Sequence, residues 1–114
     1  MVAISEQRCG KARRRGEQPH MELEIRKRRN RLLGLWAAQR LNLGSAAAIA
    51  YAGQIASDTV ANATNDGIVS RLADDLAVAG VPADLEVLRE ELQRLGNVAA
   101  LEVRKAVSRQ ARAA

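Results

Sequence analysis

The chain has 114 residues, which is enough for one small domain with a modest core and excludes a two-domain enzyme. Hydrophobic residues make up 47% of the sequence, yet aromatic residues make up 2% and Phe is absent, so Ala, Leu, Val and Ile supply the apolar surface of closely packed helices. The net charge of +5 is uneven, because residues 1–31 carry ten Lys or Arg against four Asp or Glu. This basic N-terminal part predicts an acidic partner.

The first twenty residues show almost no apolar periodicity and include Gly10, Gly16 and Pro19. We therefore expect residues 1–20 to form a mobile basic segment and residues 21–110 to form the folded domain. The chain shows neither a bilayer-spanning apolar stretch nor the apolar core of a secretory signal, and Cys9 has no partner for an intrachain disulfide. These features predict a cytoplasmic protein.

Two helices are predicted in the first half of the domain. The first is expected from Met21 to Leu41, because apolar residues recur there at spacings of three, four and seven, and Asn42 and Gly44 tolerate a left-handed helix end. Ser45 is the expected N-cap of the second helix, whose apolar stripe continues to Val60. Residues 62–67 are expected to be a break.

Two more helices are predicted in the second half. Asp66 or a residue just before it is expected to cap the third, which ends at Gly80. Asp84 opens the fourth, and we expect Gly96 to kink or divide it, since a helical Gly costs about 1 kcal/mol relative to Ala. The fold class is therefore all-α, a small four-helix bundle with short connections.

The residues that support common enzyme chemistry are scarce. One Cys and one His, Cys9 and His20, do not form a metal-ligand set, and the adjacent carboxylates at 74–75 and 90–91 diverge by about 100° around a helix axis. There is no nucleophile beside a base and no Gly-rich phosphate loop. We predict a protein that is not an enzyme and has no metal and no cofactor.

The most credible functional surface is the basic cluster that precedes the only Trp. The residues predicted to contact a partner are Arg26, Arg28, Arg29, Asn30 and Arg31. The residues predicted to form the scaffold are Leu32, Leu33, Trp36 and Tyr51. We expect Gly34 to allow close approach of a neighbouring helix, and the Tyr51 hydroxyl to reach water or a backbone group.

Three other interpretations of the basic cluster stay open. In the first, the Arg stems cover apolar surface while their charged ends remain in water. In the second interpretation, the basic residues from Arg8 to Arg31 bind nucleic acid or an anionic membrane electrostatically. A nucleotide between the helices is the third interpretation, with Arg28, Arg29 and Arg31 as phosphate partners.

The eleven residues from Arg28 to Ala38 read RRNRLLGLWAA. This segment closely resembles the signature of the zeta inhibitor subunit of alphaproteobacterial F-type ATP synthases, and the resemblance continues more weakly over about residues 21–107. It implies a four-helix bundle whose N-terminal segment enters the catalytic head of the synthase and restrains ATP hydrolysis. It also implies a cytoplasmic protein held at the inner membrane through the synthase, and weak adenine nucleotide binding as in some members.

The N-terminal segment departs from the pattern of this family. Family members carry Phe residues and an acidic run before the basic signature, whereas residues 13–20 here read RRRGEQPH. Pro19 opposes a continuous helix, and few apolar anchors are available to offset the cost of ordering an arm. We therefore predict binding to the catalytic head with weak or absent inhibition.

Overall fold

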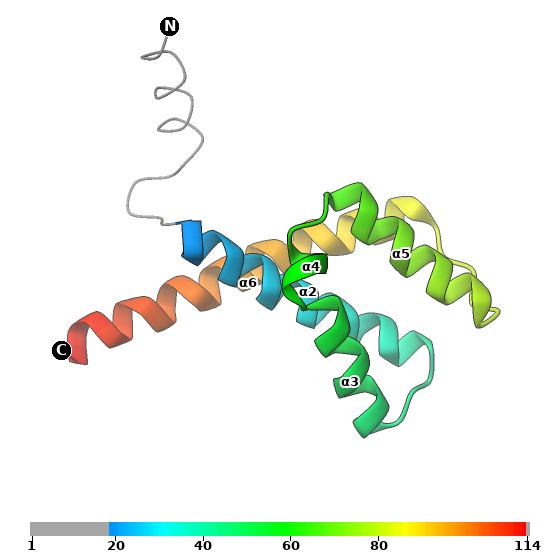
Figure 1. The fold of residues 1–114 in the computed structure, drawn as a ribbon, viewed down its shortest axis with the longest axis horizontal. Helices are drawn as coiled ribbons and strands as arrows, with labels where there is room; N and C mark the ends of the chain where they lie inside the picture. The colour runs from blue at the N-terminus through cyan, green and yellow to red at the C-terminus, as the bar shows by residue number, and fades with distance from the viewer. Residues whose placement is uncertain (1–18, 114) are drawn as a thin grey trace, which may run out of the picture.

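The computed structural model describes residues 19–113, and every regular element in that range is helical (Figure 1). The all-α prediction is confirmed, whereas the described range holds five helices rather than the expected four. Residues 1–18, which include most of the segment predicted to be mobile, lie outside the described residues. The helices are α2 (Pro19–Arg40), α3 (Ser45–Ile55), α4 (Asp58–Ala61), α5 (Asn65–Val78) and α6 (Leu85–Ala113).

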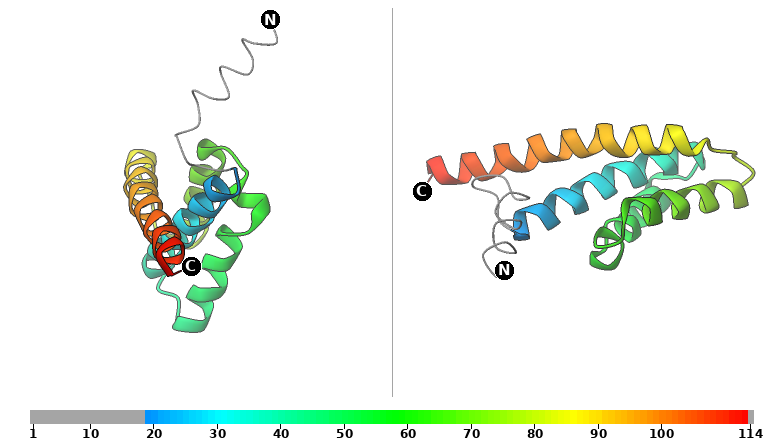
Figure 2. Two further views of the ribbon diagram at one scale, coloured as in Figure 1. Left: turned by 90° about the vertical axis from the view of Figure 1, so that its left-hand side faces the viewer. Right: turned by 90° about the horizontal axis from the view of Figure 1, so that it is seen from above.

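Helices α2 and α6 run antiparallel at the centre of the molecule (Figures 1 and 2). Helix α3 packs against α2, and α5 packs against α6, to which it is also antiparallel. The two peripheral helices α3 and α5 diverge from each other in Figure 1. The short helix α4 lies against α2 and leads from α3 to α5. The central helix α2 also contacts α5, and therefore contacts each of the other four helices between residues 19 and 113.

The core lies where these helices meet. Apolar residues at spacings of three and four turn one face of each long helix inward, as the sequence periodicity predicts. The largest fully buried apolar side chains come from four helices and are Leu33, Ile55, Ile68, Val69, Leu72, Leu76 and Leu88. Ala37, Ala38 and Ala52 are also buried, so small residues let α2 and α3 pack closely.

The second predicted helix ends earlier than expected. It ends at Ile55, and Val60 lies on the separate helix α4. Ser57 adopts an extended conformation and its hydroxyl accepts a bond from the Val60 amide at 3.4 Å, so it starts a new helix rather than continuing the old one. The predicted N-cap at Ser45 is also wrong, because the N-cap is Gly44, which makes no side-chain cap bond.

The expected break at residues 62–67 is shorter than predicted, because α5 already begins at Asn65. The remaining predicted boundaries agree closely with the structure. Asn42 has a φ of 60°, as expected for a left-handed helix end, and Gly80 has a φ of 77° after α5. Thr64, just before Asp66, caps α5 by accepting the Gly67 amide at 3.0 Å. The Asp84 carboxylate accepts the Glu86 amide at 2.9 Å where α6 begins.

Helix α6 is continuous through Gly96, so the expected division of the helix there is wrong. The flanking residues Leu95 and Ala99 are both buried in the same interface. A Cβ at Gly96 would meet the Arg29 side chain at 3.5 Å, which is ordinary contact. Packing on both sides of the glycine therefore outweighs its small intrinsic cost in a helix.

Candidate partner-binding site

The basic cluster at residues 26–31 lies on α2, where successive residues point about 100° apart around the axis. Six consecutive side chains therefore cannot share one face. Arg29 and Asn30 are buried, Arg26 and Lys27 are half-buried, and Arg28 and Arg31 are exposed. The fold divides the cluster into an inward and an outward group.

Two inward side chains join α2 to the ends of neighbouring helices. The Arg26 Nε donates to the Ala61 carbonyl at 3.0 Å, where α4 ends, and its Nη2 donates to the Asn62 side chain at 3.4 Å. Asn30 is fully buried and its Nδ2 donates to the Ile55 carbonyl at 3.1 Å, where α3 ends. The last carbonyls of a helix have no hydrogen-bond partner within that helix. Arg26 and Asn30 therefore supply donors to such carbonyls at the ends of α4 and α3.

Arg29 is the most buried charged residue in the described part of the chain, with 8% of its surface exposed. Its Nε donates to the Asn30 side chain at 2.9 Å and its Nη1 to the Asn65 side chain at 3.2 Å. Burial and the positive charge of Arg26 lower the pKa of Arg29. Its Nη2 has no hydrogen-bond partner among the described residues.

The outward group faces α4 and α6. Lys27 pairs with Asp58 on α4 at 3.0 Å, and this hydrogen bond and opposite charge raise the pKa of Lys27. Arg28 lies 3.7 Å from the Glu102 carboxylate on α6, and both side chains are about half exposed. Arg31 forms no ion pair with another described residue. Arg28 and Arg31 are therefore the members of the predicted set that a partner reaches without separation of the helices.

The predicted scaffold residues all contact the core. Leu33 is fully buried, and Leu32, Trp36 and Tyr51 pack against the buried cluster as partly buried residues. The guanidinium of Arg40 lies 4.3 Å from the centre of the Trp36 ring, a distance at which a cation is attracted to the ring face. Trp36 is thus a boundary residue rather than a fully buried one.

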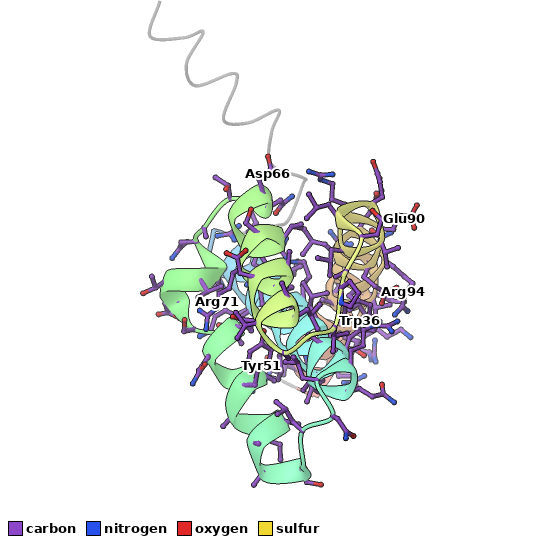
Figure 3. All side chains as sticks on the ribbon, turned by 90° about the vertical axis from the view of Figure 1, so that its right-hand side faces the viewer. Trp36, Tyr51, Asp66, Arg71, Glu90 and Arg94 are labelled. Carbon is purple, nitrogen blue, oxygen red and sulfur yellow. The ribbon has the colours of Figure 1, made fainter. Side chains whose placement is uncertain are left out.

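The Tyr51 hydroxyl has a different partner from the water or backbone group that we expected. It donates to Asp75 on α5 at 2.7 Å, and Arg71 lies 3.7 Å from the same carboxylate oxygen. Figure 3 labels Tyr51 and Arg71 at this junction between α3 and α5. Burial and this hydrogen bond raise the pKa of Tyr51. Nothing in the local sequence pairs residues 24 positions apart, so sequence reasoning missed this contact.

Two further features are absent from residues 19–113. No group of three or more His, Cys, Asp or Glu residues among them is placed to hold a metal ion. None of the helices from 19 to 113 combines the length and apolar character needed to cross a bilayer.

In a comparison with protein families, the model of ATPase inhibitor subunit zeta matches residues 11–102 of the chain. The match includes the whole basic cluster, α3, α4 and α5, and more than half of α6. The chain belongs to this family. Comparisons with curated proteins and with solved structures gave no significant match. Membership of the zeta family confirms the resemblance carried by Arg28 to Ala38.

Proposed function

We propose that this zeta-family protein binds the catalytic head of the F-type ATP synthase and regulates its hydrolysis of ATP. The observation that carries the proposal is the family match over residues 11–102. The structure is consistent with a binding protein, because Arg28 and Arg31 remain exposed on α2. The protein would act at the cytoplasmic side of the inner membrane, held there through the synthase.

The contacts made by the basic cluster bear on the alternative of nucleic acid or anionic membrane binding. Arg26 and Arg29 donate to groups of the chain itself, and Lys27 is already paired with Asp58. Electrostatic binding to phosphates depends on the number of cations available to them. The described part of the cluster therefore gives this alternative less support than the linear sequence does.

We assign inhibition of ATP hydrolysis to the N-terminal arm, by which we mean residues 1–20. Residues 13–15 of this arm are three consecutive Arg. Because the arm has few apolar anchors, we propose that it inhibits weakly while the helical domain supplies part of the binding. We also propose weak binding of adenine nucleotides, because the family resemblance implies it. We assign no pocket to this nucleotide.

The test is steady-state ATP hydrolysis by the purified catalytic head of the native host's synthase, titrated with the full chain. We expect partial inhibition, and co-purification of the two at low and moderate salt. A variant with Arg13, Arg14 and Arg15 each changed to Gln should lose inhibition. The matched control removes three exposed charges from α6 by changing Lys105, Arg109 and Arg112 to Gln, and should inhibit as the native chain does. Absence of both binding and inhibition with the native chain would refute the proposal.

A further inference from the structure

A groove of about 550 Å³ lies between the N-terminal half of α2 and the C-terminal end of α6. One wall is basic and consists of Lys27, Arg28 and Arg31, and Glu24 is the carboxylate among its described residues. The other wall carries apolar side chains of α6, namely Val103, Ala106 and Val107. We call this feature the α2–α6 groove.

The groove exists because α6 is longer than the helix beside it. Helix α6 has 29 residues and α2 has 22, which correspond to about 43 Å and about 33 Å. In Figures 1 and 2 the C-terminal end of α6 extends past the start of α2. The apolar stripe that is buried at Leu95 and Ala99 continues at Val103 and Ala106, where coverage is only partial.

The net charge around the groove is positive, although Lys27 and Arg28 on its basic wall are paired with Asp58 and Glu102. From Val103 to its end, α6 carries four basic residues and no acidic ones, and the basic residues are Arg104, Lys105, Arg109 and Arg112. Arg31 on the opposite wall has no ion-pair partner among the described residues. An occupant with carboxylates along its edges would therefore gain several favourable contacts, and a basic occupant would be repelled.

The apolar wall restricts the occupant further. Val107 is 42% exposed and Leu101, on the neighbouring face, is 55% exposed, so burial of Val107 by apolar side chains would be favourable. A phosphate backbone offers no such side chains. An extended peptide would lay unpaired backbone groups over the apolar wall, whereas a helix satisfies its own.

We propose that the α2–α6 groove binds an acidic amphipathic helix of a partner protein. The wall from Val103 to Gln110 is about two turns long, so an occupant of about three turns would cover it. Residues 1–18 of this chain are a poor occupant, because they carry five Lys or Arg against two Glu. The α6 wall lies beyond the range that the family model matches, so this inference does not rest on the proposed function.

The test uses the full chain in cells that make it naturally. Val107 is replaced by the photo-crosslinker p-benzoylphenylalanine, and a second variant carries the same group in place of Leu101, which does not line the groove. After irradiation, the cross-linked peptide is sequenced. We expect the Val107 position alone to capture a protein segment with apolar residues at spacings of three and four and flanking Asp or Glu.

The charge variants are Arg31→Glu, on the groove wall, and the control Arg89→Glu, an exposed position near the opposite end of α6. Arg31→Glu should reduce the yield of the Val107 cross-link by about fivefold, equivalent to about 1 kcal/mol, while Arg89→Glu should not. A synthetic peptide of the captured segment should bind the native chain with the same dependence. Capture of lipid, of nucleic acid, of a second copy, of residues 1–18, or of nothing beyond the Leu101 control would overturn the proposal.

Discussion

Gly34 on α2 and Ala52 on α3 approach so closely that a Cβ at Gly34 would lie 2.8 Å from the Cα of Ala52. Real Cβ atoms essentially never come so near backbone, so the helix axes are held at a separation that only glycine permits. This contact confirms the role predicted for Gly34. It also brings Asn30, one turn earlier on α2, within hydrogen-bonding distance of the end of α3.

Gly34→Ala should destabilise the fold by about 1–3 kcal/mol, because α2 and α3 must move apart and the gain in helix propensity of about 1 kcal/mol offsets only part of that cost. Urea unfolding measures the change. Gly53→Ala is the matched control on α3, since nothing lies within 4 Å of its Cβ position, and it should leave stability unchanged or raise it by up to about 1 kcal/mol. Equal effects of the two changes would contradict the close approach.

Asn30→Ala should lower the free energy of unfolding by about 2–4 kcal/mol. It removes the donor to the Ile55 carbonyl and the acceptor of the Arg29 Nε, and it leaves a small cavity. The control Asn97→Ala removes an exposed Asn from α6 and should change stability by no more than about 0.5 kcal/mol. If chemical denaturation finds that Asn30→Ala lowers the free energy of unfolding no more than Asn97→Ala does, the bond from Asn30 to the Ile55 carbonyl does not stabilise the fold.

Thr64→Ala should cost about 1 kcal/mol, because the Gly67 amide in the first turn of α5 loses the hydroxyl that accepts it. Ser70→Ala, at an exposed position inside the same helix, should have almost no effect. Unfolding midpoints of the two variants, measured side by side, give the comparison. A neutral Thr64→Ala would mean that the Gly67 amide is satisfied equally well by water.

Tyr51→Phe should change how stability depends on alkaline pH. The folded state raises the pKa of Tyr51 above its unfolded value of about 10, so it holds the phenolic proton more tightly than the unfolded state does. The stability from this group is fully present below pH 10 and is lost as the pH rises above it. The native protein should therefore lose more stability between pH 8 and pH 11 than Tyr51→Phe does.

Urea unfolding of both proteins at the two pH values checks this, and the comparison removes contributions from Lys and Arg that both proteins share. At pH 8, Tyr51→Phe should itself cost about 1 kcal/mol through loss of the bond to Asp75. Parallel pH profiles for the two proteins would show that the Tyr51 hydroxyl is not held by Asp75 in solution.

Several features were determined by the sequence alone. The spacing of apolar residues such as Leu72, Leu76 and Leu88 placed the helices and their buried faces, because that periodicity is a local property of the chain. Asn42, Gly80 and Asp84 marked boundaries through their backbone preferences and capping groups. The segment from Arg28 to Ala38 indicated the zeta family, and the match over residues 11–102 confirms it.

Only the tertiary structure decided which of the basic residues are available to a partner. Arg28 and Arg29 are adjacent in the sequence and carry the same charge. Arg29 is nevertheless buried against Asn30 and Asn65, while Arg28 faces α6. The difference arises because α3, α4 and α5, distant in sequence, cover one side of α2 and leave the other beside the end of α6. A one-dimensional pattern places a residue on a helix, but packing between helices determines which side is exposed.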